Sequence, residues 1–166
     1  GPWRRLAHRT REDLEAAGLQ LRLDTTATSI DVAGQRLLVR DASGREELVP
    51  YDELVVGTGA LPVRPPISGL AELGPEDGVH LLHSMEDTFA LTATMEQIAP
   101  RRALIVGAGY IGLEMAEALT ARGIAVTQVE ALPEVLPTVD PPLGALIHDE
   151  LNRRGVDVRT GVTVTR

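Results

Sequence analysis

Residues 103–112 read ALIVGAGYIG, an unbroken apolar run followed by glycines in the pattern G-x-G-x-x-G. The four apolar residues from Ala103 to Val106 predict a β-strand covered on both faces, as parallel strands in α/β proteins are. Gly107 permits a tight turn, Gly109 has no Cβ to keep a pyrophosphate from the backbone, and Gly112 allows close helix–strand packing. The stretch therefore predicts a strand, a dinucleotide-binding loop and the start of a helix.

The residues around this stretch alternate between helix and strand patterns. The first helix is expected to end at Gly123, with a buried face of Ile111, Met115, Ala118 and Leu119. After a strand over 125–129, a second helix is expected from Asp140-Pro141 to Gly155, with a face of Leu143, Leu146, Ile147 and Leu151. With a third strand over 156–158, residues 102–160 read β-α-β-α-β. The predicted fold is α/β, an incomplete Rossmann-like doubly wound parallel sheet.

The loop and an acid beyond it form the candidate cofactor site. A helix N-terminus offers N–H groups and a positive dipole end to a phosphate, so the candidate residues of the loop are Gly107, Ala108, Gly109, Tyr110, Ile111 and Gly112. Glu130 ends the second strand, where a carboxylate accepts hydrogen bonds from ribose hydroxyls and repels a 2′-phosphate. These features favour NADH over NADPH. The alternative for the loop is that its glycines only make a tight turn between strand and helix. The alternative for Glu130 is a solvated acid at the end of a strand.

The first half of the chain carries a different pattern. Thr10 and Asp13 predict a short capped helix that stops at Gly18. Short strands are expected over 19–23, 30–32, 37–39 and 48–49 as a small antiparallel meander, followed by a strand over 54–56. Ser84 predicts the start of a helix that ends before Pro100. The expected domains are 1–70, 71–83 as a linker and 84–166.

Composition excludes several kinds of chemistry. All 16 cations among the 166 residues are arginines and there is no cysteine, which excludes a P-loop, a Schiff base and a thiol nucleophile within this chain. A net charge of −8 with 2% aromatic residues argues against nucleic acid as a partner. No apolar run approaches the roughly 20 residues that span a bilayer, so a cytoplasmic protein is expected. His80 and His83 lack a third ligand, so no metal site is predicted; His8 and His148 are interpreted as surface residues.

Two stretches together resemble the pyridine nucleotide-disulfide oxidoreductase family of FAD-dependent flavoproteins. They are YDELVVGTGALP at residues 51–62 and residues 103–130 with their GAGYIGLEMAEAL core. The sequence GLEMAEAL within this core is most similar to that of NADH oxidases and coenzyme A-disulfide reductases. The resemblance implies that residues 1–70 are part of an FAD-binding domain, with the main chain of Ala27 toward the FAD adenine. It also implies FAD contacts at Thr58, Gly59 and Ala60, although Gly57 stands where the family usually has alanine.

The resemblance further implies roles for two residues of the nucleotide helix. Tyr110 would lie over the flavin and Glu114 near the nicotinamide; without the resemblance, they are a half-exposed aromatic residue and a solvated acid. Glu114 is also expected at the edge of the buried helix face, where an unpaired charge is costly. No residue here is proposed as catalytic.

The implied activity passes hydride from NADH to FAD and electrons on to a disulfide, oxygen or a redox protein, in a homodimeric parent. A second G-x-G-x-x-G, a redox cysteine and a dimerisation domain are absent, and the chain opens with Gly1-Pro2-Trp3. The chain is thus expected to be an internal piece of a longer oxidoreductase that by itself binds only dinucleotide. The alternatives are a non-catalytic NADH-binding sensor or regulatory module and an oxidoreductase of another Rossmann family.

Overall fold

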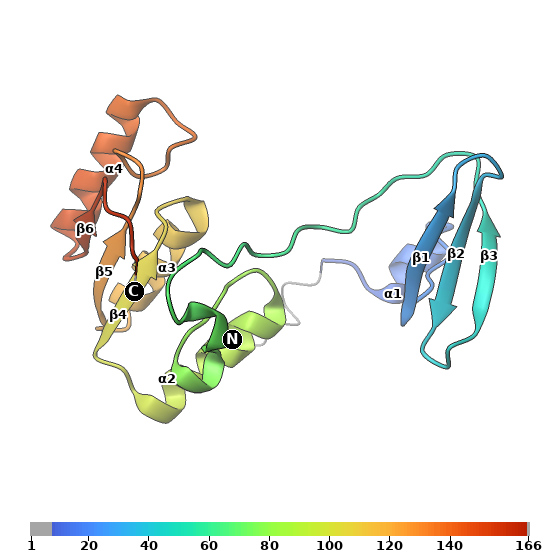
Figure 1. The fold of residues 1–166 in the computed structure, drawn as a ribbon, viewed down its shortest axis with the longest axis horizontal. Helices are drawn as coiled ribbons and strands as arrows, with labels where there is room; N and C mark the ends of the chain where they lie inside the picture. Colours follow the sequence, from blue (N-terminus) through green and yellow to red (C-terminus); the bar gives the residue numbers. More distant parts are fainter. Residues whose placement is uncertain (1–7, 166) are drawn as a thin grey trace. The chain divides into compact units, whose positions relative to one another are not determined.

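The computed structural model describes residues 8–165 and divides the chain into two compact units, Gly1–Thr58 and Gly59–Arg166. Figure 1 shows an antiparallel sheet in the first unit and a parallel sheet with helices in the second. The opening Gly1-Pro2-Trp3 lies outside the described residues. The units reflect contacts within this chain, so the domain boundaries at 70 and 83 stay predictions.

The first unit consists of one short helix and a three-stranded meander. Helix α1 (Arg11–Ala16) begins with the predicted capping box, in which the Asp13 N–H donates to Thr10 Oγ1 at 3.2 Å and the Thr10 N–H to Asp13 Oδ2 at 2.8 Å. Strands β1 (Thr25–Asp31), β2 (Arg36–Asp41) and β3 (Glu46–Pro50) pair antiparallel in the order β1-β2-β3. The predicted antiparallel meander is confirmed for three of its four strands.

Two strands predicted in this half do not form. Residues 19–23 have no strand, and Leu19 and Leu23 are exposed, because the sheet begins only at Thr25 and gives their alternating pattern no face to cover. Residues 54–56 pair with no strand among the described residues, and the side chain of Val55 is 90% exposed. A strand is held by hydrogen bonds to a neighbour, so an apolar β-branched run alone does not make one.

The second unit opens with short turns before its first long helix. The helical turns η2 (Leu70–Glu72) and η3 (Pro75–Asp77) lead to helix α2 (Met85–Ile98). The side chain of Arg64 donates to the carbonyl oxygens of Leu70 and Leu73, which holds the first turn. Ser84 caps α2 with Asp87, as predicted, and Ala99 ends it in the left-handed conformation.

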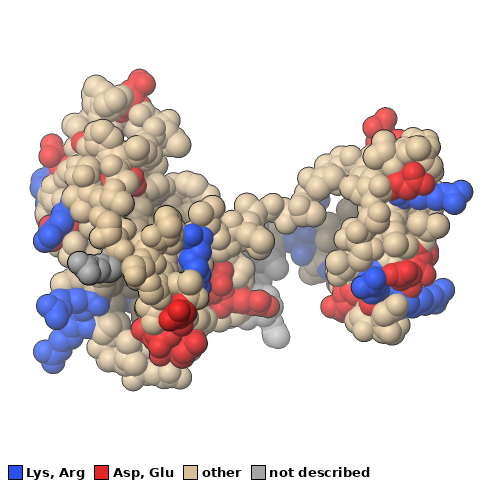
Figure 2. Space-filling model, viewed as in Figure 1, with Lys and Arg blue, Asp and Glu red and all other residues tan. Residues whose placement is uncertain are grey.

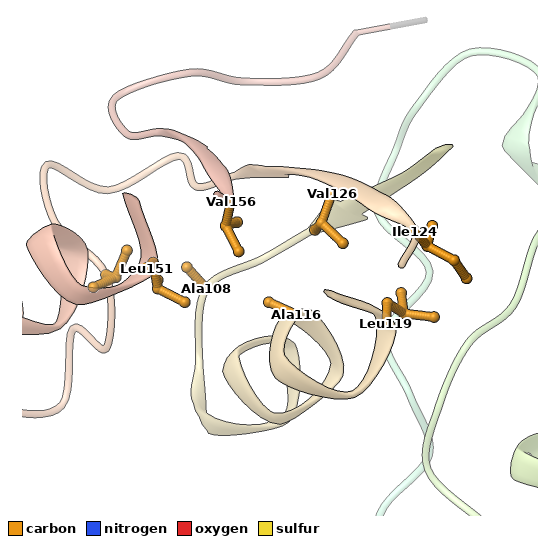
Figure 3. Packing of buried hydrophobic residues seen from close by; sticks show 8 residues of the cluster. Ala108, Ala116, Leu119, Ile124, Val126, Leu151 and Val156 are labelled. Atoms are coloured by element: carbon orange, nitrogen blue, oxygen red, sulfur yellow. The ribbon is translucent and has the colours of Figure 1, made fainter. Parts of the chain in front are cut away.

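The predicted β-α-β-α-β order is confirmed in the rest of this unit. Its elements are β4 (Arg102–Val106), α3 (Tyr110–Thr120), β5 (Ala125–Val129), α4 (Pro141–Arg153) and β6 (Asp157–Arg159). The three strands are parallel in the order β4-β5-β6. Figure 3 shows the core, where α3, β5 and α4 meet; its buried residues are Ala108, Ala116, Leu119, Ile124, Val126, Val135, Leu151 and Val156. None of the helices within residues 8–165 has the length and apolar character to cross a bilayer.

Three predicted faces need correction. Strand β4 is covered on one face only: Ala103 and Ile105 pack on the core, whereas Leu104 is 59% exposed. Successive right-handed crossovers place α3 and α4 on the same side of the sheet, which leaves the other face uncovered by them. Helix α3 buries Ala116 and Leu119 but leaves Ile111 38% exposed.

The face of helix α4 is set by a glycine rather than by its largest apolar side chains. Gly144 and Leu151 are buried, whereas Leu143 and Leu146 are exposed. A Cβ at residue 144 would lie 2.8 Å from the Val135 carbonyl oxygen, so the helix approaches the preceding loop at its smallest residue. This close approach turns the predicted apolar stripe partly toward solvent.

Candidate dinucleotide-binding site

The turn between β4 and α3 depends on a residue in the left-handed conformation, which only glycine adopts without strain. Gly107 has a φ of +104°, and its N–H donates to the Val129 carbonyl oxygen at 2.8 Å. The Gly107 carbonyl oxygen accepts a hydrogen bond from the Gln128 Nε2 atom at 3.0 Å. Strand β5 thus holds both backbone groups of the first glycine.

The next residue of the loop is held in the same way. Ala108 is completely buried, and its N–H donates to Glu130 Oε2 at 2.7 Å. Its carbonyl oxygen accepts from the Leu136 N–H at 2.8 Å. All four backbone polar groups of residues 107 and 108 therefore bond to residues 128–136, so the loop is preorganised before any ligand arrives.

The other two glycines of the motif differ in what surrounds them. A Cβ at residue 112 would lie 2.3 Å from the Gly107 carbonyl oxygen and 2.9 Å from Gln128 Nε2, so only glycine fits there. A Cβ at residue 109 would meet no atom within 4 Å. Gly112 thus serves the packing of α3 on the loop, whereas the space beside Gly109 is open to a ligand.

Helix α3 begins without the usual compensation for its free N–H groups. Helices α1 and α2 start with a hydroxyl cap and two acids in the first turn, and α4 starts at Asp140 followed by two prolines. The N-cap of α3 is Gly109, which offers no side-chain hydrogen bond, and its first turn has no acid. The first N–H groups of a helix have no partner inside the helix. This helix start thus suits an anion such as a phosphate.

Glu130 lies where the sequence predicts, directly after β5 and beside the glycine loop. Both carboxylate oxygens accept backbone hydrogen bonds, Oε2 from Ala108 at 2.7 Å and Oε1 from Leu132 at 2.9 Å. Its own N–H donates to the Arg159 carbonyl oxygen at 2.9 Å, which extends the sheet by one residue. The structure thus brings the acid and the loop together, while its contact with a ribose stays a prediction.

Tyr110 and Glu114 are both exposed on α3. The side chain of Tyr110 is 69% exposed at the first position of the helix. The expectation that Glu114 edges onto the buried face is wrong, because α3 packs through Ala116 and Leu119. The roles of Tyr110 and Glu114 beside the flavin and nicotinamide stay predictions.

The segment from Ala131 to Val139 follows Glu130 and contacts both the glycine loop and α4. Val135 is 1% exposed, and Glu134 Oε1 lies 2.8 Å from His148 Nδ1. His148, interpreted as a surface residue, has a side chain that is 22% exposed and therefore partly buried in this pair. The Val135 N–H lowers the pKa of Glu134; burial opposes this effect and His148 adds to it.

The residues implied for FAD belong to a different part of the chain. Ala27 pairs with Val39 at the edge of the meander, just before an irregularity at Thr28. Ala27 and Thr58 line one groove between β1 and residues 54–58. Gly59, with a φ of +72°, and Ala60 fall in the second unit. The structure therefore joins Ala27 to Thr58 only, and the contacts of all four residues with FAD stay predictions.

Sequence reasoning missed three contributors to the site: Gln128, Glu134 and Leu136. Gln128 could have been found from the sequence AVTQV, because a long polar residue is unusual in a strand that is buried on both faces. Leu136 contributes a backbone N–H and has a φ of +48°, and neither feature has a sequence signal.

Charged side chains of both signs lie close together on the visible face of each unit, as Figure 2 shows. Several form ion pairs, among them Arg22 with Glu47 at 2.8 Å, Arg40 with Glu46 at 2.7 Å and Arg159 with Asp157 at 2.8 Å. Such pairs are typical of a solvated surface and contribute little to stability.

Comparison with known proteins gives extensive similarities in sequence and structure. An NADH oxidase of Methanocaldococcus jannaschii is 38% identical over 136 residues, which are 81% of this chain and 30% of that protein. The water-forming NADH oxidase of Lactobacillus brevis, solved with NADH bound, has a TM-score of 0.84 and 28% identity over 99% of this chain and 36% of its own. An engineered mutant of that oxidase, solved with NADPH bound, has a TM-score of 0.83 and 26% identity over the same shares.

The chain spans about a third of the length of the curated relatives it matches. A family model described as pyridine nucleotide-disulphide oxidoreductase matches residues 4–166. That match includes both the glycine loop with Glu130 and the stretch that ends at Ala60. With the fold and both motifs in agreement, the chain belongs to the pyridine nucleotide-disulphide oxidoreductase family.

Proposed function

We propose that the chain binds NADH at the loop of residues 107–112, with the pyrophosphate on the start of α3 and the adenosine ribose on Glu130. The observation that carries the proposal is the 2.7 Å hydrogen bond between Ala108 and Glu130, because it holds a carboxylate against a preorganised phosphate loop. The open space beside Gly109 and the uncapped start of α3 fit a dinucleotide.

Two features of the site favour NADH over NADPH. A carboxylate at Glu130 repels a 2′-phosphate, and Arg159, which pairs with Val129 in the sheet register, directs its guanidinium to Asp157 instead. The mutant oxidase solved with NADPH supports the assignment. Among the residues replaced in it are a glycine and an aspartate whose separation in sequence equals that of Gly112 and Glu130 in this chain. The alanine after that aspartate is also replaced, and Ala131 follows Glu130 here.

The whole protein to which this chain belongs is then an FAD-dependent oxidoreductase. With both cofactors bound, FAD would supply hydride acceptance from NADH and transfer of electrons to a disulfide, oxygen or a redox protein. The chain's own residues would hold the two cofactors: Ala27, Thr58, Gly59 and Ala60 toward FAD, and Tyr110 with Glu114 where flavin and nicotinamide meet. The groove shared by Ala27 and Thr58 supports this assignment. A homodimer and a cytoplasmic location are part of the same proposal.

Calorimetric titration of the chain with NADH and NADPH tests the cofactor assignment. Tighter binding of NADH supports it, and equal affinity for the two cofactors contradicts it. The oxidoreductase assignment is tested in a longer protein that contains this chain, where a flavin absorption spectrum should be bleached by NADH. A colourless protein that binds NADH would instead be a sensor or regulatory module.

A further inference from the structure

Gln128 is a buried polar residue without an evident role in stabilising the core. Its side chain is completely buried in β5, between Thr127 and Val129. Its amide nitrogen donates to the Gly107 carbonyl oxygen at 3.0 Å, whereas its amide oxygen is buried and has no hydrogen-bond partner among the described residues. A buried acceptor left unpaired costs about 1–3 kcal/mol. An apolar residue would avoid this cost but would leave the Gly107 carbonyl oxygen without this donor, so the use of the amide lies at the glycine loop.

The position of the amide indicates that use. Gln128 Nε2 lies 2.9 Å from the place that a Cβ of residue 112 would occupy. The amide therefore fills the space that Gly112 leaves open, between the glycine turn and the first turn of α3. From there it fixes the Gly107 carbonyl oxygen, while the Ala108 N–H on the other side of the same peptide bond donates to Glu130. The side chains of Gln128 and Glu130 thus hold the C=O and the N–H of the peptide bond between residues 107 and 108.

We propose that Gln128 is a positioning residue for the dinucleotide: its amide orients the 107–108 peptide and thereby aims the N–H groups that follow at the pyrophosphate. This inference rests on the proposed function. Gln128 does not contact the ligand, since it is buried beneath the loop. Its effect is expected on cofactor affinity and on the mobility of the loop, with little effect on overall stability.

The test compares Gln128→Met with the unsubstituted chain, because methionine has a similar length and no donor. Loss of one buried hydrogen bond should weaken NADH binding about three- to tenfold. Hydrogen exchange of the backbone over residues 107–112 should become faster. The melting temperature should stay within a few degrees, because removing the unpaired oxygen offsets the lost bond. Gln128→Leu serves as a second variant if the methionine variant does not fold.

Two control variants separate positioning from general destabilisation. Thr127→Val removes a side-chain hydrogen bond to Asp157 from the same strand and should leave NADH affinity unchanged. Val126→Ala makes a cavity in the core beside the loop and should lower the melting temperature without a matching loss of affinity. If Val126→Ala weakens NADH binding as much as Gln128→Met does, the role of Gln128 is structural and the inference is wrong.

The two proposals fail in different ways. Unchanged NADH affinity and unchanged loop exchange in a folded Gln128→Met variant overturn the positioning role and leave the proposed function standing. Absence of NADH binding by the unsubstituted chain overturns the proposed function. In that case, faster exchange of residues 107–112 in the variant still supports the part of the inference that concerns the loop.

Discussion

Glu130 accepts a hydrogen bond from the buried N–H of Ala108 at 2.7 Å, so the acid that ends one strand holds the loop that follows the neighbouring strand. The other carboxylate oxygen accepts from Leu132 at 2.9 Å. Each carboxylate oxygen has more than one acceptor site, so a ribose hydroxyl can donate to the same group while both bonds persist. Glu130 thus supports the loop and keeps acceptor capacity for the ribose contact proposed above.

We expect Glu130→Ala to weaken NADH binding at least tenfold, or about 1.4 kcal/mol, and to narrow the difference between NADH and NADPH. The ribose acceptor is lost, and so is the charge that repels the 2′-phosphate. The buried Ala108 N–H is left unpaired, so the melting temperature should also fall by several degrees. Calorimetry with both cofactors and a thermal melt measure these effects.

Two further variants serve as controls. Glu96→Ala removes an exposed acid from α2 and should change neither affinity. Glu130→Gln removes the charge but has only one acceptor oxygen for the two backbone donors, so it should narrow the selectivity with a smaller loss of stability than Glu130→Ala. An unchanged preference for NADH in both Glu130 variants would contradict the role of this acid.

Gly109 and Gly112 should separate ligand binding from folding. A Cβ at residue 109 meets no protein atom, and its φ of −73° suits alanine, so Gly109→Ala should fold normally. Its methyl group would stand where the pyrophosphate approaches, so NADH binding should fall more than tenfold. Gly112→Ala should lower stability by about 1–3 kcal/mol, because its Cβ would overlap the Gly107 carbonyl oxygen. Urea unfolding and NADH titration of both variants measure these effects. Normal NADH binding by Gly109→Ala would contradict the placement of the pyrophosphate beside Gly109.

The sequence predicted the β-α-β-α-β order, the glycine turn and the place of Glu130 at the end of the second strand, because these depend on local signals. The glycines dictate backbone angles, caps such as Ser84 mark helix starts, and apolar runs mark strands. Those signals lie within a few residues of the feature they specify, so no knowledge of the tertiary contacts is needed.

The errors have a common cause in contacts between distant residues. The strand expected over 54–56 has no neighbouring strand within residues 8–165, and the face of α4 is decided by the close approach of Gly144 to Val135. The pairing of Glu134 with His148 joins the loop before α4 to the helix itself. Periodicity describes one segment at a time, so it could not show which partner each face would meet.

Gly144→Ala should disturb the site from a distance. Its Cβ would lie 2.7 Å from Glu134 Cγ and 2.8 Å from the Val135 carbonyl oxygen, so α4 and the segment from 131 to 139 must separate. We expect a loss of about 1–3 kcal/mol in stability and weaker NADH binding, because the same segment supplies the Leu136 N–H to the glycine loop. Ala145→Ser, at an exposed position of the same helix, is the control and should change neither quantity. Full NADH affinity in a destabilised Gly144→Ala variant would contradict the link.

The Glu134 carboxylate should make stability depend on pH in a defined range. Its pKa is lowered in the folded chain by the Val135 N–H, with burial in opposition and His148 in support. The folded state therefore gains stability from this group above the ordinary value of 4.5 and loses that stability as pH falls through the lower folded value.

Glu134→Gln removes this titration while keeping an acceptor oxygen. The unsubstituted chain should exceed the variant in unfolding free energy near neutral pH, and the difference should shrink as the pH falls below 4.5 and through the lowered folded pKa of Glu134. Urea unfolding at a series of pH values measures it, with Glu96→Gln as the control for an exposed acid. A difference that stays constant down to the acid end would mean that Glu134 stabilises the fold without its charge, and the predicted pH dependence would then be wrong.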